Sequence, residues 1–195
     1  MPYPMTLFKS LSQPIGPVFE TERCFVRAPE DADYAGWTEL RAISRDFLQP
    51  YEPRWPLDEL TRASYRRRMR RYTQDARDKV GFAFFVFDRA TDELLGGLTV
   101  SNIRYGVSQS CALGYWMGAP FAQLGYMREV LPAVMPFLFG ELGLHRIEAA
   151  CLPHNEASMG LLKRVGFHEE GLAKAYLKID GQWRDHRLFA KIAPH

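Results

Sequence analysis

The residues of greatest chemical interest surround Gly125, where a predicted strand gives way to a predicted helix. Backbone N–H groups at a helix start have no partner within the helix, and the helix dipole places partial positive charge there. An anion such as a pyrophosphate can bind at this position without a lysine. Gly125 would let the backbone approach that anion closely. The same glycine is equally compatible with an ordinary turn.

A second group of candidates begins the predicted helix that follows Pro153. Asn155 is a favourable N-cap, which typically contributes about 1 kcal/mol to helix stability. Ser158 follows three residues later, so its side chain lies on nearly the same face of the helix. Both positions therefore have a structural explanation, as a cap and as a small packing residue.

An aromatic, proline-rich loop is predicted at residues 47–56. Its three prolines fix φ and remove backbone donors, which predicts a stiff, non-helical segment. Tyr51 and Trp55 offer broad contact to a flexible peptide end at little entropic cost. Anchoring of the loop in the core is the competing interpretation.

An arginine cluster, Arg66 to Arg71, belongs to the helix predicted over residues 58–78. Tyr65, Met69 and Tyr72 form the apolar stripe of that helix, so the arginines should point outward or sideways. A solvated face is the simplest explanation. Contact with ribosomal RNA or an acidic protein is the alternative, through phosphate-type interactions.

The elements that must position these residues alternate between strand-like and helical patterns. Strands are predicted at residues 18–27, 80–88, 94–105, 109–117, 146–152, 173–179 and 182–192. Helices are predicted at residues 30–48, 58–78, 127–142 and 155–165. Asp180-Gly181 is a strong hairpin signal, and Gly166 is a suitable C-terminal cap. This order predicts a mixed α/β layer fold that contains an antiparallel meander.

One predicted helix, residues 127–142, contains Pro132 and Pro136. An internal proline removes a hydrogen bond and costs about 3 kcal/mol of helix stability. We therefore expect a kink, an early end or tertiary compensation in this helix.

The composition narrows the class of protein. The 195 residues are 47% hydrophobic and carry a formal net charge of +2, which is too mild for a non-specific nucleic-acid coat. No stretch approaches the ~20 apolar residues of a membrane span, and residues 1–20 lack a signal-peptide pattern. Cys24, Cys111 and Cys151 are odd in number and widely spaced, which favours core packing in a reduced cytosol and no metal site. We therefore expect a cytoplasmic protein.

Beyond these patterns, the chain resembles the GNAT acetyltransferases, which use acetyl-coenzyme A. Their pyrophosphate loop reads Arg/Gln-x-x-Gly-x-Gly/Ala, and Ala122, Gly125 and Met127 occupy its positions here. Ala122 removes one usual side-chain contact, and Gln123 stands where glycine is common. Asn155-Glu156-Ala157-Ser158 and Gly166-Phe167 match two further family motifs.

Other segments are similar to the RimJ branch of this family, with RimL enzymes as relatives, and the likeness extends over residues 18–192. The segments are 47–55, 153–155 and 176–186. The resemblance implies a single GNAT domain over residues 18–195, after an irregular lead-in at residues 1–17. A mostly antiparallel central sheet, flanking helices and a C-terminal hairpin are expected.

The resemblance also implies an N-acetyltransferase with acetyl-CoA as co-substrate. The expected acceptor is the N-terminal alanine of a small-subunit ribosomal protein. A peptide α-amino group has a pKa of about 7.7–8.0, so roughly 10–15% is neutral at pH 7 and little deprotonation is needed. The alternatives are a small-molecule amine as acceptor, or a non-catalytic CoA-binding protein that associates with the ribosome.

The resemblance assigns roles to individual residues. Backbone donors from Gln123 to Met127 are expected to hold the pyrophosphate. The remaining cofactor contacts are expected at Trp116, Met117, Leu124, Tyr126, Asn155 and Ser158. Ser158 would hydrogen-bond to the departing thiolate or protonate it. A backbone N–H near Met117 would polarise the thioester carbonyl.

The general base is harder to assign. RimL enzymes carry a glutamate just before the Tyr-Leu that aligns with Tyr176-Leu177, but this chain has Ala175 there. Glu148 and Glu52 remain as candidate bases. Acceptor contacts are expected from Tyr51, Glu52, Trp55, Trp183 and His186.

Overall fold

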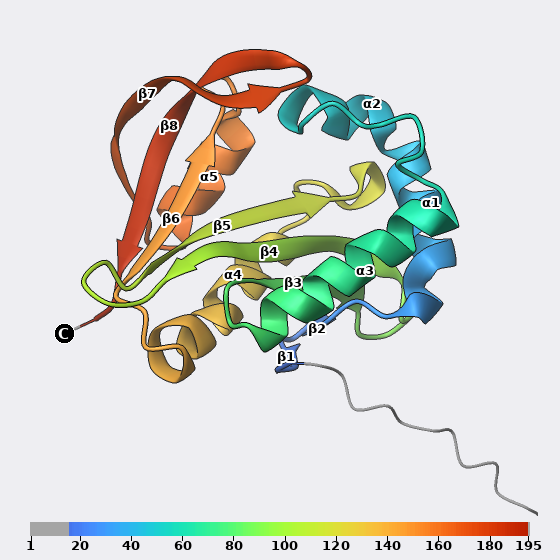
Figure 1. Ribbon diagram of the computed structural model, residues 1–195, viewed down its shortest axis with the longest axis horizontal. Helices are drawn as coiled ribbons and strands as arrows, with labels where there is room; N and C mark the ends of the chain where they lie inside the picture. The colour runs from blue at the N-terminus through green and yellow to red at the C-terminus, as the bar shows by residue number, and fades with distance from the viewer. Residues whose placement is uncertain (1–15, 195) are drawn as a thin grey trace, which may run out of the picture.

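Eight strands form one sheet in the order β1-β2-β3-β4-β5-β6-β8-β7 (Figure 1). This computed structural model describes residues 16–194, so nearly all of the lead-in expected at residues 1–17 lies outside the described residues. The strands are β1 (Phe19–Glu20), β2 (Cys24–Arg27), β3 (Phe82–Asp88), β4 (Leu94–Arg104), β5 (Ser110–Met117), β6 (Arg146–Cys151), β7 (His168–Ile179) and β8 (Gln182–Ile192). Every neighbouring pair is antiparallel except β5 and β6, which confirms the predicted fold class.

Helices cover both faces of the sheet. In Figure 1, α1 (Tyr34–Ile43) and α3 (Arg62–Arg77) lie in front of it, whereas α4 (Tyr126–Pro136) and α5 (Glu156–Arg164) lie behind it. The short helix α2 (Arg45–Leu48) follows α1. One-turn 3-10 helices occur at Asp31–Asp33, Gln49–Tyr51 and Ala119–Phe121.

The side chains of β3 show why helices are needed on both sides. Phe84 belongs to the core cluster that α4 and α5 complete, and Phe85 packs in a second cluster with Trp37 and Tyr65 of α1 and α3. Successive residues of a strand point to opposite faces, so an unbroken apolar run requires cover on both. The burial predicted for this strand is confirmed.

Several element boundaries differ from the predictions. The strand predicted over residues 18–27 is two short strands, because Thr21 Oγ1 accepts a hydrogen bond from the N–H of Cys24 (2.9 Å) and closes a turn. The third helix, α3, begins at Arg62 because Thr61 caps it. The aromatic loop at residues 47–56 is predicted to be non-helical throughout, but its first two residues belong to α2 and Gln49–Tyr51 form one 3-10 turn. Strand β7 begins at His168, five residues before the predicted start.

Pro132 and Pro136 lie inside an uninterrupted α4. Both prolines are exposed, whereas Val130, Leu131 and Val134 are fully buried. The carbonyl groups that lose a donor therefore lie on the solvent side, and burial of the opposite face supplies the expected tertiary compensation. After Pro136 the chain widens into one π-helical turn, Phe137–Glu141.

The three cysteines are free and buried in the core, as predicted from their number and spacing. Among residues 16–194, no helix is long and apolar enough to cross a bilayer. In the same part of the chain, no group of three or more His, Cys, Asp or Glu side chains is arranged to hold a metal ion.

Candidate functional site

The centre of the site is a gap in the sheet. Strands β5 and β6 run parallel but pair only between Ser110–Ala112 and Arg146–Glu148, where both strands begin. Beyond these residues the strands separate, and a cavity of about 590 Å³ opens between them. We call it the splay cavity. All of the predicted cofactor residues except the exposed Leu124 line it, namely Trp116, Met117, Gln123, Gly125, Tyr126, Met127, Asn155 and Ser158.

The glycine turn at one end of the splay cavity has the geometry of an anion-binding loop. Gln123 and Gly125 adopt left-handed conformations with φ of 60° and 88°. Within residues 16–194, the five N–H groups from Gln123 to Met127 donate no hydrogen bond. A diphosphate fits this run of free donors at the start of α4.

Two arginines that the sequence analysis did not select also line the splay cavity. They are Arg128 in the first turn of α4 and Arg164 in the last turn of α5. Both bring positive charge to the cavity, which favours an anionic ligand. Arg128 follows Gly125 by three residues, so a basic residue in the first helical turn was the signal available in the sequence.

The turn between β1 and β2 braces the glycine turn. The guanidinium of Arg23 donates to the carbonyl oxygen of Leu124 (3.2 Å) and to Glu129 Oε1 (2.5 Å). Thr21 Oγ1 donates to Glu129 Oε2 (3.1 Å). Burial alone would raise the pKa of Glu129, but the hydrogen bonds from Arg23 and Thr21 outweigh it and hold that pKa below its usual value. No local pattern predicts this brace, because Arg23 and Glu129 lie 106 positions apart in the chain.

Three polar side chains meet at the other end of the splay cavity. Asn155 Oδ1 accepts a hydrogen bond from the N–H of Ser158 (3.0 Å), so Asn155 caps α5 as its type predicted. Tyr115 Oη and Ser158 Oγ lie 2.7 Å apart. Burial raises the pKa of Tyr115 well above its usual range, so its hydroxyl stays protonated and can donate. Tyr115 was missed from the sequence because it resembles any aromatic residue of a buried strand.

Peptide groups on one edge of β5 face the splay cavity. The N–H of Gly118 donates to the carbonyl oxygen of Leu95 in β4 (2.8 Å). Along an antiparallel ladder, every second residue hydrogen bonds to the partner strand, and the residues between them direct their peptide groups the other way. Trp116 therefore also hydrogen bonds to β4, whereas the peptide groups of Tyr115 and Met117 point toward the gap. The donor expected near Met117 is thus available. The peptide groups of Trp116 face β4 instead, and the cofactor contact expected at Trp116 stays a prediction.

Of the two candidate bases, Glu52 reaches the cavity and Glu148 does not. Glu148 lies outside the cavity lining, where it pairs with Arg146 at 2.8 Å. Glu52 lines the splay cavity and also a second cavity of about 770 Å³ between α3, the loop after α2 and strands β3 to β5. We call the second one the α3-side cavity. Its position makes Glu52 the better candidate for contact with an acceptor.

Residues 23–168 match the family described as Acetyltransferase (GNAT) domain. The chain belongs to the GNAT acetyltransferase family. It is 36% identical over 174 residues to the ribosomal protein uS5 alanine N-acetyltransferase of Escherichia coli K12, which covers 89% of this chain and 90% of that protein.

Solved structures agree with this assignment. The ribosomal-protein-S5-alanine acetyltransferase of Vibrio fischeri has a TM-score of 0.84 at 30% identity, over 91% of this chain and 97% of that one. RimJ of Mycobacterium smegmatis, solved with CoA-disulfide, has a TM-score of 0.82 at 32% identity. The match covers 91% of this chain and 86% of that one. The protein is therefore an acetyl-CoA-dependent N-acyltransferase with homology to ribosomal-protein acetyltransferases.

Some of the predicted acceptor residues of this GNAT domain line the splay cavity, and others lie outside it. Tyr51 is 40% exposed and lines the splay cavity, where its ring lies 6.0 Å from that of His154. His186 lines the same cavity, is 3% exposed and contacts the carbonyl oxygen of Arg184 through Nδ1 (3.0 Å). Trp183 lines neither cavity and is 64% exposed.

Trp55 anchors the aromatic loop of the GNAT domain. It is only 7% exposed, and its Nε1–H donates to Glu52 Oε2 (2.8 Å). The loop is fixed to the C-terminal hairpin as well, because the N–H of Asp180 donates to the carbonyl oxygen of Glu52 (2.9 Å). The core-anchoring interpretation of Trp55 is thus correct, although its ring also lines the α3-side cavity.

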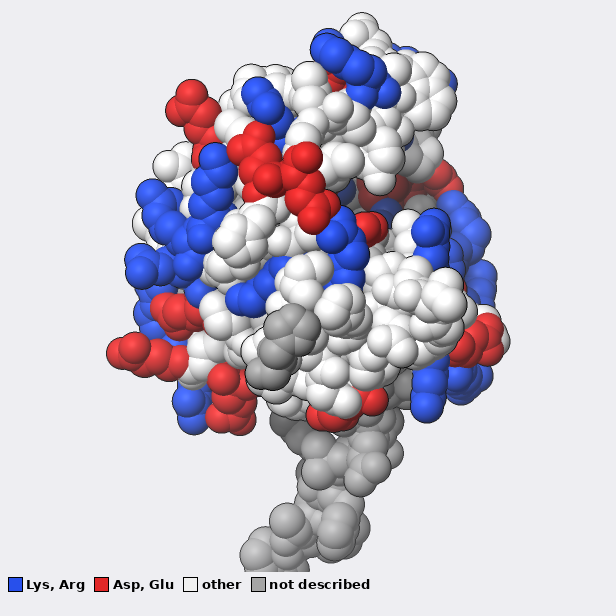
Figure 2. All heavy atoms as spheres, turned by 90° about the vertical axis from the view of Figure 1, so that its left-hand side faces the viewer, with Lys and Arg blue, Asp and Glu red and all other residues white. Residues whose placement is uncertain are grey.

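The arginine cluster on α3 points in two directions. Arg66, Arg67, Arg70 and Arg71 are exposed, as expected, but Arg68 turns inward and pairs with the buried Glu59. Another side of the molecule carries charges of both signs. Figure 2 shows Lys, Arg, Asp and Glu side chains intermixed on the face that carries β7 and β8, and ion pairs such as Arg187–Glu169 (3.1 Å) and Lys174–Asp185 (2.8 Å) belong to these strands.

Proposed function

We propose that the protein acetylates the N-terminal alanine of a small-subunit ribosomal protein in the cytoplasm, through the single GNAT domain of residues 18–195. The observation that supports this most directly is the splay cavity. It has free backbone donors at one end and a hydroxyl pair at the other. The two relatives at 36% and 30% identity that are named for the uS5 or S5 alanine reaction support the acceptor.

The co-substrate is held along the splay cavity. In this proposal, the N–H groups from Gln123 to Met127 bind the pyrophosphate, and Arg128 adds positive charge. The free peptide edge at Met117 and the side-chain amide of Asn155 bind the pantetheine arm. Acetyl-CoA, when bound, supplies an activated thioester whose carbonyl carbon accepts a nucleophile.

The transfer then needs a neutral amine and a proton for the sulfur. The amine nitrogen forms a bond to the carbonyl carbon, the carbon–sulfur bond breaks, and the nitrogen gives one proton to water. Ser158 Oγ–H donates a proton to the departing thiolate, and the neighbouring Tyr115 hydroxyl holds Ser158 in place for that transfer. One proton passes from the amine to water, one passes from Ser158 to the sulfur, and Ser158 regains a proton from that water, so the serine and the solvent end as they began.

Binding and turnover on defined acceptors test this proposal. We expect calorimetric heat on titration with acetyl-CoA, and we expect mass spectrometry to show acetylation of an alanine-initiated peptide. Gly125→Ala should weaken acetyl-CoA binding by about tenfold, because a left-handed conformation costs an L-residue about 1–2 kcal/mol. The added Cβ would also lie 3.3 Å from Arg23 Nη2. Gln123→Gly relieves the same kind of strain and is the matched control, with binding retained.

The alternative acceptors give different results in the same assay. If only free small amines react, the ribosomal-protein acceptor is wrong while the enzyme class stands. Binding of acetyl-CoA without turnover on any amine would leave only the non-catalytic alternative. In that case, the exposed arginines of α3 would be tested for salt-dependent RNA binding.

A further inference from the structure

One carboxylate lies where the two cavities meet. Glu52, Gly114, Tyr115 and Trp116 are the residues that line both the splay cavity and the α3-side cavity. Glu52 is also the single carboxylate in the lining of the splay cavity within residues 16–194. An acceptor that reaches the thioester from the α3 side therefore passes this side chain.

The hydrogen bonds of Glu52 leave one acceptor site open. A carboxylate has about four lone-pair sites. Arg41 Nη1 donates to Oε1 (2.7 Å), while Arg41 Nη2 and Trp55 Nε1 both donate to Oε2 (2.6 and 2.8 Å). Three sites are thus occupied, and no donor among residues 16–194 fills the fourth, which is on Oε1. The side chain of Glu52 is 21% exposed, so a ligand can reach that site.

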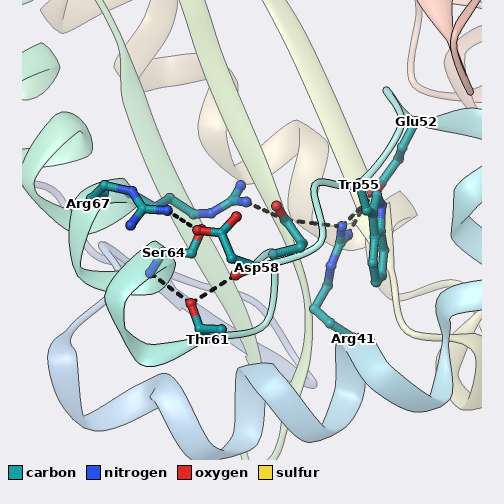
Figure 3. Close-up of polar contacts among 9 residues, drawn as sticks. Arg41, Glu52, Trp55, Asp58, Thr61, Ser64 and Arg67 are labelled. Atoms are coloured by element: carbon teal, nitrogen blue, oxygen red, sulfur yellow. Dashed lines mark hydrogen bonds and ion pairs between the residues drawn. The ribbon is translucent and has the colours of Figure 1, made fainter.

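Arg41 and its neighbours cancel the charge of Glu52. The Arg41 side chain is only 7% exposed, and its guanidinium lies over the rings of Trp55 (4.2 Å) and Trp116 (5.0 Å). Arg41 Nη2 is also 4.0 Å from Glu59, which Arg68 of α3 pairs with. Figure 3 shows this line of contacts from α3 to Trp55. The charges of the two arginines and the two glutamates in this line therefore add up to zero.

This neutrality matters for an amine nucleophile. An unpaired carboxylate within ~4–6 Å of an amine raises the pKa of that amine and favours the unreactive ammonium form. A carboxylate that a guanidinium has already neutralised can accept an N–H hydrogen bond with much less of this bias. The pair therefore suits the orientation of a neutral amine.

We propose that Glu52 orients the acceptor amine through the open site on Oε1, and that Arg41 is a positioning residue that keeps this amine neutral. The proposal rests on the proposed function, because it takes an amine as the acceptor. It gives Glu52 a role as a hydrogen-bond acceptor in place of the role of general base.

Other charged and titratable groups surround Glu52 and must be held constant in a test. Arg54 pairs with Asp180 of the hairpin at 3.7 Å, and His186 contacts Arg184. Among residues 16–194, the titratable groups that contact Glu52 or line a cavity with it include Arg41 from α1, Glu59 from the loop, Arg68 from α3, Tyr115 from β5, and Asp180 and His186 from the hairpin.

The pH dependence of kcat tests the role of Arg41, because kcat reports groups in the substrate complex. Wild type and Arg41→Gln are compared on an alanine-initiated peptide at saturating acetyl-CoA. Without Arg41, Glu52 is unpaired, so the acid limb of kcat should move about one pH unit upward. The value of kcat at pH 7 should then fall about tenfold and recover near pH 9, while KM stays the same or decreases. Arg77→Gln on the exposed end of α3 is the control and should not change the profile.

Two further variants separate charge from folding. In Arg41→Gln combined with Glu52→Gln, neither charge remains, so the acid limb should return to its wild-type position at a lower rate. Glu59→Gln leaves an excess of positive charge and should move the acid limb downward by a smaller amount. Near-ultraviolet circular dichroism and thermal melts check that each variant folds. Glu59→Gln remains decisive even if Arg41→Gln does not fold.

A uniform decrease of kcat at every pH in Arg41→Gln would show that Arg41 is only structural, and it would overturn the proposal. An unchanged or upward-shifted acid limb in Glu59→Gln would do the same. If instead the proposed peptide acceptor is wrong, the result differs from both of these, because wild type would then acetylate small amines and not the peptide. The same pH profiles, measured on such an amine, would still test the Arg41–Glu52 pair.

Discussion

At the scale of single residues, the hydroxyl pair of Tyr115 and Ser158 has the clearest chemical consequence. The two oxygens are 2.7 Å apart, and burial keeps the Tyr115 phenol protonated. Ser158 can therefore give its proton to a thiolate while it accepts a hydrogen bond from Tyr115. Either hydroxyl can be the donor when the site is empty of substrate.

Removal of these hydroxyls should lower kcat in a graded way. We expect Ser158→Ala to reduce kcat by about 10²-fold or more, as for loss of a general acid, and Tyr115→Phe to reduce it by about tenfold. The KM for acetyl-CoA should change little, which steady-state kinetics will measure. Because the raised pKa keeps Tyr115 protonated, wild type should show no loss of activity from its ionisation up to about pH 10. Equal activity of Ser158→Ala and wild type would contradict the assigned role.

Some of these residues were predictable, and the reason is local. Asn155 and Gly125 act through their own helix termini, so residue type and position were enough to select them. Tyr115 and Ser158 are 43 positions apart, and Arg41 meets Glu52 only because the loop after α2 folds back on α1. Such contacts depend on the packing of whole elements, which hydrophobic patterns do not specify.

At the scale of elements, the start of α4 is held by the turn between β1 and β2. Glu129 accepts hydrogen bonds from Arg23 and Thr21, and these bonds keep its pKa low despite partial burial. A group with a depressed pKa stabilises the fold above its unfolded pKa, and that stabilisation is lost as the pH falls through the folded value. The brace should therefore weaken in acid.

Glu129→Gln tests this pH dependence. At pH 7 we expect a loss of about 1 kcal/mol or less, because the pair is partly exposed and solvent screens it. Between about pH 5 and pH 3, wild type should lose more stability than the variant, so the two curves converge. Urea denaturation at several pH values measures both. Parallel curves over that range would show that the ionisation of Glu129 is not coupled to folding.

Most elements of the sheet were predictable because their signals lie within each strand. The apolar run of β3 and the Asp180-Gly181 turn of the hairpin are examples. The boundaries of β1 and α3 were not, because each is decided by a single hydrogen bond that the side chain of Thr21 or Thr61 accepts from a backbone N–H. The separation of β5 from β6 was also absent from the predictions, since no local pattern tells how far two strands stay paired.

At the scale of the whole molecule, the splay cavity divides the sheet into two arms. The first arm runs from β1 to β5, the second consists of β6, β8 and β7, and they join through three residues of each strand. In the proposed function, the co-substrate touches α4 on one arm and α5 on the other. A ligand in this position should stabilise the native state as a whole.

Acetyl-CoA should therefore raise the melting temperature. At 100 times its dissociation constant, a ligand that binds only the native state adds about 2.7 kcal/mol, which corresponds to roughly 5–10 °C for a chain of this size. Differential scanning fluorimetry will measure the shift. Gly125→Ala should show a smaller shift at the same concentration, and an equal shift in both proteins would contradict binding at the glycine turn.

The hydrogen bond from Asp180 to Glu52 joins parts of the chain that a ribosome makes far apart in time. The loop after α2 emerges before β3, whereas its partner at Asp180 follows only after β7 has been made. This bond can form only after the hairpin has been made, so it should form late when the chain folds during synthesis. A nascent chain that lacks the hairpin would thus lack one wall of the site. The site would therefore be completed only when the hairpin has been made and has paired with the loop after α2.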